Sequence, residues 1–283
     1  MTILVIGKTG QVAQELAMLP ETVCIGREEA DLTAPEQCSS AIHTHTPTAV
    51  INAAAYTSVD KAEEEEALAT LINGDAPGVM ARACASLAIP FVHISTDYVF
   101  EGGGTEAWKP TDPTAPLGAY GRSKLAGERK VRAASGAHAI LRTSWVVSAH
   151  GSNFVKTMLR LGAERDALNV VDDQIGSPTA ARDIAAACHA MALQVIADTG
   201  KTGTYHFSGM PDCSWADFAR AIFELAGLNC EVSSIPSSDY PTPAARPLNS
   251  RLDCTSTKEV FGIDRPDWRK SLTDILEDLG ATK

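Results

Sequence analysis

Short apolar runs alternate with longer amphipathic stretches over the first 150 residues of the chain. The short runs predict strands at Ile3–Ile6, Thr22–Ile25, Ala49–Asn52, Phe91–Ser95 and Ala139–Arg142. The amphipathic stretches between them predict helices at Gln11–Leu19, Glu36–Thr44, Ala62–Ile72, Pro77–Leu87 and Tyr120–Ala134. Alternating strands and helices indicate βαβ units, and nearly continuous apolar strands indicate a parallel sheet covered on both faces. We therefore expect an α/β fold with a doubly wound parallel sheet.

The pattern is less regular after residue 150. One further strand is predicted at Tyr205–Phe207 and a final helix at Ser271–Leu279. A helix is expected at Ser214–Ala226, because Ser214 can cap it and its apolar residues fall on one face. The stretch Ile235–Leu252 is rich in Pro and Ser and predicts a long ordered loop. We expect residues 1–150 to form one domain and residues 151–283 a smaller α/β substrate domain, with some of the chain crossing back.

Composition narrows the class of protein. The chain has 283 residues, of which 45% are apolar and 21% charged, as in ordinary globular proteins. No apolar run approaches the roughly 20 residues that span a bilayer, and the first strand begins almost at residue 1 without a basic leader. The net charge of −11 argues against nucleic acid as a partner. The seven cysteines include no CxxC pair, so we expect reduced thiols, no zinc site and a cytoplasmic protein.

A glycine-rich loop follows the first predicted strand and opens the first predicted helix. Gly7 and Gly10 are spaced Gly-x-x-Gly-x-x-Ala, with Gln11, Val12 and Ala13 after them. Such a loop turns the chain, lets backbone N–H groups approach a pyrophosphate and permits close helix–strand packing. A lone glycine loop is often only a tight turn, but its position directly after the first strand favours dinucleotide binding. A phosphate-loop NTPase is excluded, because no Gly-Lys-Ser/Thr follows the glycine at the spacing that this motif requires.

The ends of the next two strands suggest where the dinucleotide lies. Arg27 follows the second strand and, together with Lys8, can accept a 2′-phosphate, which favours NADPH and leaves NADH open. Asp31 and Leu32 are expected to flank the adenine. Ala53, Ala54 and Ala55 end the third strand, and their small side chains leave room for a ligand at this sheet edge.

The strongest chemical signal is Tyr120 followed by Lys124. Residues four apart share one face of a helix, so both side chains can enter one cleft. An ammonium near a phenol favours the phenolate, and we expect it to lower the tyrosine pKa towards working pH. The strand at Phe91–Ser95 leads into Thr96 and Asp97 at the carboxyl edge, where open α/β sheets bind ligands. Thr96 is expected to hydrogen-bond a substrate carbonyl. Chance Tyr-x-x-x-Lys spacing and simple turn capping are the alternatives.

Together these motifs resemble the extended short-chain dehydrogenase/reductase superfamily, which has a Rossmann-like fold. The resemblance is closest to the dTDP-4-dehydrorhamnose reductase family and covers essentially the whole chain. It rests on six segments, at residues 7–12, 52–63, 95–100, 120–128, 142–145 and 240–247. The last segment lies in the expected substrate domain, so the similarity extends beyond the cofactor fold. Two departures are Ala13, where the family often has Gly, and Arg27, where an acidic residue can occur.

The resemblance implies NAD(P)H-dependent reduction of C4 in dTDP-4-dehydro-β-L-rhamnose. By motif match, Tyr120 is the proton donor, Lys124 lowers its pKa and holds the nicotinamide ribose, and Thr96 tunes the keto group. Asp97 and Trp145 would contact the sugar nucleotide, although Trp145 alone indicates only a core aromatic. Arg246 would pair with the diphosphate, for which its planar fork is suited.

The resemblance also leaves some points open. Family members can form homodimers, some with Mg²⁺ held by glutamates; Glu15 is one candidate ligand, but no others can be placed, so we predict no metal site. An epimerase or dehydratase of the same superfamily is a second hypothesis, weakened because Thr96, Asp97 and Tyr98 offer a single carboxylate. A third is a non-enzymatic regulator, since the regulatory subunit of methionine adenosyltransferase resembles this family and binds a dinucleotide. The presence of Tyr120, Lys124 and Thr96 together favours an enzyme.

Overall fold

The predicted strands assemble into one parallel sheet in a computed structural model, which describes residues 1–282. Its strand order is β10-β5-β4-β3-β1-β2, and every neighbouring pair runs parallel. The strands are β1 (Ile3–Ile6), β2 (Thr22–Ile25), β3 (Ala49–Asn52), β4 (Phe91–Thr96), β5 (His138–Thr143) and β10 (Gly203–His206). The predicted parallel sheet is therefore confirmed, with each predicted strand placed to within two residues at either end.

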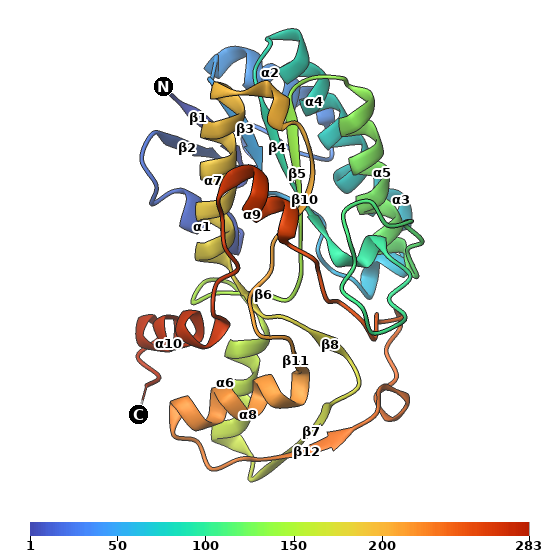
Figure 1. The fold of residues 1–283 in the computed structure, drawn as a ribbon, viewed down its shortest axis with the longest axis vertical. Helices are drawn as coiled ribbons and strands as arrows, with labels where there is room; N and C mark the ends of the chain where they lie inside the picture. Colours follow the sequence, from blue (N-terminus) through green and yellow to red (C-terminus); the bar gives the residue numbers. More distant parts are fainter. Residues whose placement is uncertain (283) are drawn as a thin grey trace.

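Alternation along the strands places helices on both faces of this sheet. Ile3 and Val5 point to one face and Leu4 and Ile6 to the other, as successive strand residues must. The second of these faces is covered by α2 (Pro35–His45), α4 (Ala76–Ser86) and α5 (Ala119–Ala133). The first face is covered by α1 (Gln11–Leu16) and α7 (Ala181–Ala197). Figure 1 shows the sheet between these two layers, which is the doubly wound arrangement expected.

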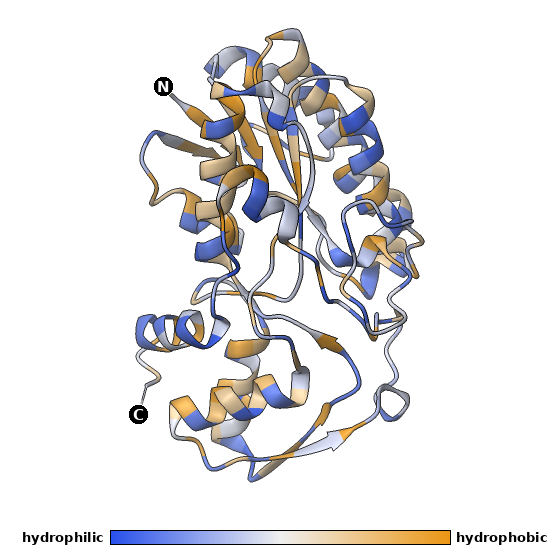
Figure 2. Cartoon of the chain, in the orientation of Figure 1, coloured by the Kyte–Doolittle hydropathy of each residue, from blue (hydrophilic) through white to orange (hydrophobic). Residues whose placement is uncertain are grey.

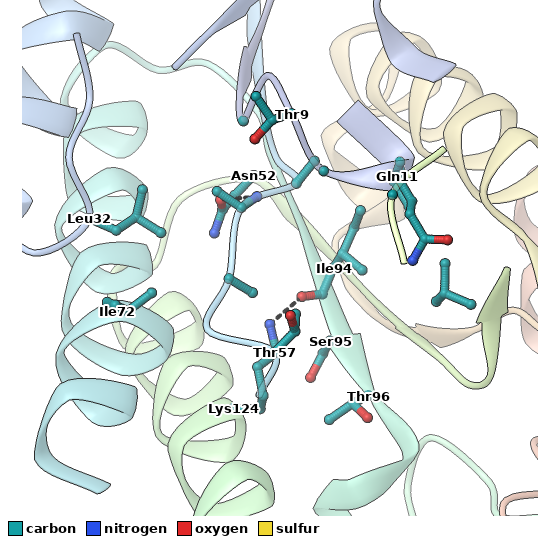
Figure 3. A pocket seen from close by; sticks show the side chains of 18 of the residues that line it. Thr9, Gln11, Leu32, Asn52, Thr57, Ile72, Ile94, Ser95, Thr96 and Lys124 are labelled. Atoms are coloured by element: carbon teal, nitrogen blue, oxygen red, sulfur yellow. Dashed lines mark hydrogen bonds between the residues drawn. The ribbon is translucent and has the colours of Figure 1, made fainter. Parts of the chain in front are cut away.

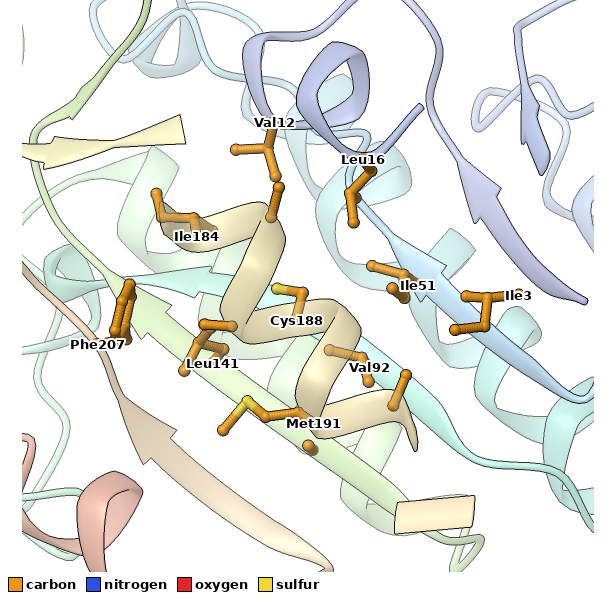
Figure 4. Close-up of a cluster of buried hydrophobic side chains, with 14 of the residues drawn as sticks. Ile3, Val12, Leu16, Ile51, Val92, Leu141, Ile184, Cys188, Met191 and Phe207 are labelled. Carbon is orange, nitrogen blue, oxygen red and sulfur yellow. The ribbon is translucent and has the colours of Figure 1, made fainter. Parts of the chain in front are cut away.

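Helix α7 is the largest element that the periodicity did not predict. Its buried residues are mainly small, among them Ala181, Ala185 and Cys188, and they pack onto strand residues such as Val92 and Leu141 (Figure 4). Alanines carry little hydropathy contrast between faces, so a helix buried on most sides gives a weak periodic signal. The chain then returns to the sheet as β10, where a strand was expected at Tyr205–Phe207.

The predicted helix at Ala62–Ile72 is wrong as a single element. The structure has a 3₁₀ turn at Lys61–Glu63, then α3 (Glu66–Thr70) and a π turn at Leu71–Asp75 that runs directly into α4. The π turn contains Asn73, whose side chain hydrogen-bonds the backbone N–H and carbonyl of Tyr56. The turn interrupts the regular α-helical period at this point. Helix α1 also ends three residues before its predicted end, and Pro20 follows soon after.

The remaining elements form a second layered unit below the sheet in Figure 1. It contains α6 (Phe154–Glu164), α8 (Trp215–Ala226), α10 (Trp268–Asp278) and the parallel pair β7 (Ala167–Val171) and β12 (Glu231–Ile235). Among the shorter elements, α9 (Thr255–Phe261) packs against α7 and β10 of the first unit, and the second unit contains β6 (Val146–Val147), β8 (Ile175–Gly176), β9 (Thr179–Ala180) and β11 (Cys213–Ser214). Their shared core includes Phe218, Phe223 and Trp268. Figure 2 colours the central strands mainly as hydrophobic and many helix residues as hydrophilic.

The predicted helix at Ser214–Ala226, the final helix and the loop after Ile235 are confirmed, whereas α6, β7 and β12 were not predicted. Ser214 caps α8 through a capping box with Asp217, and the final helix begins three residues earlier than predicted. Beyond Ile235 the chain is a loop with one 3₁₀ turn, held by bridges from Asn249 to Ile175 and from Leu252 to Trp108. Within residues 1–282, no helix is long and apolar enough to cross a bilayer.

Candidate active site

A single cavity of about 740 Å³ runs along the carboxyl ends of the sheet strands (Figure 3). Its size falls in the range of cofactor and ligand sites. Nearly all residues predicted for the site line it: Gly7, Gly10, Gln11, Val12, Arg27, Asp31, Leu32, Ala53, Ala54, Ala55, Thr96, Asp97, Tyr120, Lys124 and Trp145. Arg246 is the exception. The fold therefore brings segments that are far apart in sequence to one sheet edge.

The glycine loop lies against the end of β3. Gly7 has a φ of +129°, and a Cβ there would lie 3.2 Å from the carbonyl carbon of Ala53. Only glycine can adopt this φ and also leave room for the Ala53 backbone without strain. Gly10 is the N-cap of α1, and within residues 1–282 no side chain caps that end. Ala13 is fully buried, and its methyl group fits 3.4 Å from the position of a Gly7 Cβ, so this departure does no harm to the packing.

The corner beside β2 carries two cations, each paired with a carboxylate. Arg27 Nε lies 2.9 Å from Asp31 Oδ2, and Lys8 Nζ lies 3.0 Å from Glu28 Oε1. Hydrogen bonds from Thr33 hold the pKa of Asp31 below its usual value. The guanidinium and ammonium that favoured a 2′-phosphate are thus present, but neighbouring negative charges offset them.

Tyr120 and Lys124 lie one turn apart near the start of α5. Lys124 is buried, and its Nζ donates to the carbonyl oxygen of Ile94, 2.6 Å away (Figure 3). Tyr120 is half-buried and meets the ring of Tyr98 edge-on, with centroids 5.4 Å apart. Both side chains line the cavity, as the helical spacing predicted.

The electrostatics of the pair differ from the sequence-based expectation. Burial lowers the pKa of Lys124 to about 8, and the charge of Glu128 opposes this change. The pKa of Tyr120 lies above its ordinary value, first because of burial and then because of the Asp97 charge. The expected net lowering of the Tyr120 pKa is wrong for this arrangement, because burial and the carboxylate of Asp97 raise it, while the ammonium of Lys124 is bonded to a backbone carbonyl.

Thr96 and Asp97 form a buried hydroxyl–carboxylate cluster at the end of β4. The Thr96 hydroxyl donates to Asp97 Oδ1 at 3.0 Å and accepts from the Tyr98 backbone N–H at 3.2 Å. The Ser250 hydroxyl donates to the other carboxylate oxygen. Burial raises the pKa of Asp97 to about 6 despite these bonds. Ser250 belongs to the long loop and had no sequence signal of its own.

Trp145 and Arg246 occupy different positions relative to the cavity. Trp145 lines it with a left-handed backbone, φ +48°, and its ring stacks on Trp215 at a centroid distance of 3.6 Å. It is half-buried, so it is both a packing residue and a cavity wall. Arg246 donates to Asp60 Oδ2 at 2.7 Å, and its buried Nη1 has no hydrogen-bond partner among the described residues.

A set of polar residues that the sequence did not single out holds α5 in place. Asn73 Nδ2 donates to the Tyr56 carbonyl and to the Ser123 hydroxyl, and Asn73 Oδ1 accepts from the Tyr56 N–H. Ser123 stands between Tyr120 and Lys124 on α5. The π turn that carries Asn73 interrupts the helical period, which is why hydropathy could not reveal this cluster.

The Mg²⁺ that the resemblance raised does not fit the surroundings of Glu15. Its carboxylate faces the guanidinium of Arg182, whose Nε lies 3.7 Å away, and the imidazole of His150, whose Nε2 lies 3.6 Å away. Arg182 also reaches Asp274 and Asp278 on α10. Across residues 1–282, no three His, Cys, Asp or Glu side chains are grouped so as to hold a metal. A guanidinium therefore takes the place between the carboxylates.

Comparison with known proteins extends over the whole chain. The family model described as the RmlD substrate binding domain matches residues 1–281. A dTDP-4-dehydrorhamnose reductase from Burkholderia thailandensis is 44% identical, with 99% of each chain covered. A crystal structure of a dTDP-4-dehydrorhamnose reductase from Clostridium acetobutylicum superposes with a TM-score of 0.92 at 37% identity, over 99% of this chain and 100% of the other.

A second solved structure bears on the cofactor. It is a dTDP-4-dehydrorhamnose reductase from Bacillus anthracis in complex with NADP, with a TM-score of 0.91 and 34% identity. The alignment covers 98% of this chain and all of that one. Its likeness extends through the cavity-bearing sheet and the second unit alike.

Proposed function

The chain belongs to the RmlD substrate binding domain family, and on that premise we propose that it reduces the 4-keto group of dTDP-4-dehydro-β-L-rhamnose to give dTDP-L-rhamnose. It is an NAD(P)H-dependent oxidoreductase of nucleotide-sugar synthesis. The observation that carries this function is the single cavity that joins the glycine loop, the Thr96 strand end and the Tyr120–Lys124 pair. A purely non-enzymatic dinucleotide-binding protein has no need of a buried lysine beside a phenol in that cavity.

The cofactor fits the half of the cavity beneath the glycine loop. Gly7 and Gly10 expose backbone there without side chains, and Ala53 to Ala55 leave the β3 edge open. Gln11 and Val12 begin α1 beside the phosphates, and Leu32 with Asp31 borders the adenine. Arg27 favours the 2′-phosphate of NADPH, while Asp31 keeps NADH as a usable alternative. When bound, the reduced dinucleotide supplies the hydride.

Tyr120, Lys124 and Thr96 carry the proton chemistry in this proposal. The phenol of Tyr120 holds the proton that passes to the C4 oxygen of the sugar. Its raised pKa keeps the phenol protonated and ready to donate at neutral pH. Lys124, whose pKa is near 8, is largely charged at neutral pH and stabilises the phenolate that remains. The Thr96 hydroxyl lies beside the phenol and orients the keto oxygen.

The substrate side is formed by Asp97, Trp145 and Arg246. Asp97 and Trp145 line the cavity, where they can meet the sugar hydroxyls and the sugar ring. The buried Nη1 of Arg246, which has no hydrogen-bond partner within residues 1–282, offers a donor for the diphosphate after a change in the loop that carries it. We assign cofactor binding mainly to residues 1–150 and sugar-nucleotide binding to residues 151–283, with α7 and β10 crossing back.

We also propose a cytoplasmic protein that works as a homodimer without nucleic acid. The free thiols of all seven cysteines suit a reducing compartment, and the net charge of −11 disfavours nucleic acid. Light scattering of the purified protein tests the dimer, and a monomer at working concentration would contradict it.

The test is loss of NADPH absorbance with dTDP-4-dehydrorhamnose made in situ from dTDP-glucose. We expect oxidation of NADPH, slower oxidation of NADH, and a loss of about 10²–10⁴-fold in kcat for Tyr120→Phe. Tyr205→Phe, which removes a phenol that donates to the Lys201 carbonyl on the far part of the sheet, is the matched control. Tight NADP binding without turnover would favour the regulator, and sugar isomerisation without net oxidation would favour an epimerase.

A further inference from the structure

The carboxylate of Glu128 is fully buried on the same face of α5 as the proposed catalytic pair. Tyr120, Lys124 and Glu128 follow one another at intervals of four residues, so they form one stripe along the helix. Glu128 has no exposed surface, and Lys124 is only 3% exposed. The proposed reduction uses the first two residues of this stripe and assigns no role to the third.

Glu128 is bound to two members, Ser95 and Arg142, of a row of residues that crosses the sheet. Ser95 on β4, Arg142 on β5 and His206 on β10 are register partners, so their side chains lie side by side on one face. Glu128 Oε1 accepts from the Ser95 hydroxyl at 2.7 Å and from Arg142 Nε at 2.8 Å. Glu128 Oε2 accepts from Arg142 Nη2 at 2.7 Å. The carboxylate thus receives a two-pronged guanidinium and a hydroxyl, all inside the protein.

These bonds attach α5 to the strand segment that ends in Thr96. Lys124 Nζ is bonded to the Ile94 carbonyl (Figure 3), and Glu128 is bonded to the side chain of Ser95, the next residue of the strand. Thr96 follows directly and lines the cavity beside Tyr120. Two adjacent residues of β4 are therefore fixed to two successive turns of α5. A shift of the helix along the strand would break both attachments.

We propose that Glu128 is a positioning residue for the reduction: its buried carboxylate fixes Ser95 to α5 and places a negative charge one helical turn beyond Lys124, which keeps that ammonium charged. This inference rests on the proposed function. Glu128 acts through Ser95 and Lys124, without touching the reacting atoms.

The groups around Lys124 support this role for the charge. On α5 they are Tyr120 and Glu128, and on β4 the neighbour is His93, which burial keeps neutral by holding its pKa well below the usual value. Asp97, beyond β4, acts on Tyr120. Glu128 therefore supplies the negative charge that counters the burial of Lys124, even though Arg142 also binds it.

The direct test is the titration of Lys124 in protein carrying ¹³C-labelled lysine, with its signal identified by its loss in Lys124→Arg. We expect a midpoint near 8 in the natural protein and a midpoint lower by about 0.5–1 pH unit in Glu128→Gln. The fall of kcat on the alkaline side should move to lower pH by the same amount. An unchanged midpoint in Glu128→Gln would overturn the proposal.

The matched control is Arg132→Gln. Arg132 touches the same carboxylate, 3.2 Å from Oε2, but from the half-exposed outer side, so its removal should leave the midpoint and kcat in place. If Glu128→Gln does not fold, Ser95→Ala tests the positioning role in its place. This variant keeps the Glu128–Arg142 ion pair and removes only the hydrogen bond between α5 and β4. We expect about tenfold lower kcat at unchanged NADP affinity, and natural kcat in that variant would contradict the positioning role. If the natural protein shows no reductase activity, the proposed function fails while the Lys124 titration still decides the charge.

Discussion

At the residue scale, the site depends on polar groups that are buried with their partners. Asp97 illustrates the cost, because its carboxylate is almost fully buried and accepts side-chain hydrogen bonds from the hydroxyl groups of Thr96 and Ser250. Neutral hydroxyl donors do not fully replace water around a charge. Its pKa therefore rises to about 6, whereas the ordinary value is 3.8. The ionised form at neutral pH is held at a cost in stability, as is common where function requires a charge.

The resulting pH dependence of stability has a definite sign. The folded-state pKa of Asp97 is raised, so its stabilising contribution is present at low pH and is lost as pH rises through about 6. Between pH 5 and pH 7 this one group should lower the free energy of unfolding by about 1.4 kcal/mol.

Urea unfolding at both pH values measures this effect. Other groups titrate in the same range, so the natural protein is compared with Asp97→Asn, in which this contribution is absent. The difference in unfolding free energy between the two proteins should change by about 1.4 kcal/mol between the two pH values. A difference that stays constant would show that Asp97 keeps its usual pKa in the folded protein.

At the scale of elements, the position of α5 is set from both sides. On one side the Glu128–Arg142 ion pair attaches the helix to the sheet, and on the other side the helix packs against the π turn that carries Asn73. Gly127 permits the close approach, because a Cβ there would lie 2.1 Å from the carbonyl oxygen of Asn73. The helix that carries the proposed catalytic pair is thus fitted against a backbone carbonyl with no room for one methyl group.

Gly127→Ala should therefore move α5 relative to the π turn. Overpacking of this kind costs about 1–3 kcal/mol of unfolding free energy, and kcat should fall because Tyr120 and Lys124 move with the helix. Urea unfolding and steady-state kinetics measure the two effects. Gly103→Ala is the control, since a Cβ there meets only a Glu101 oxygen at 4.0 Å. Equal stability and activity of the two variants would mean that the helix and the turn adjust freely.

At the scale of the whole molecule, the hydropathy pattern predicted the features that follow from its periodicity and from the position of a residue along a strand. The alternation of Ile3 to Ile6 and its counterparts placed the sheet, and strand ends such as Thr96 placed the cavity edge. Helix α7 was not predicted, because its small residues give little hydropathy contrast between the faces of the helix. The roles of the partners of the site residues were not predicted either. Ser250, Asn73 and Arg142 act through contacts between distant segments, which no local pattern encodes.

The same limit applies to the acidic cluster around Glu15. The family resemblance raised this glutamate as one candidate ligand for Mg²⁺ without predicting a metal site, and the fold places Arg182 of α7 between it and two aspartates of α10. The guanidinium connects the first helix of the chain with the last one. Because a fixed cation already neutralises these carboxylates, the protein should need no divalent ion to keep α1, α7 and α10 together.

We accordingly expect the melting temperature and reductase activity of the natural protein to be the same with Mg²⁺ and with EDTA. Arg182→Glu reverses the charge and leaves four carboxylates near one another, which should lower the melting temperature through like-charge repulsion. Added Mg²⁺ should restore part of that loss in the variant, because carboxylate oxygens are its preferred ligands. Arg160→Glu, on an exposed i,i+4 pair of α6, is the control for charge reversal alone. If EDTA destabilises the natural protein, an ion and not Arg182 links these helices.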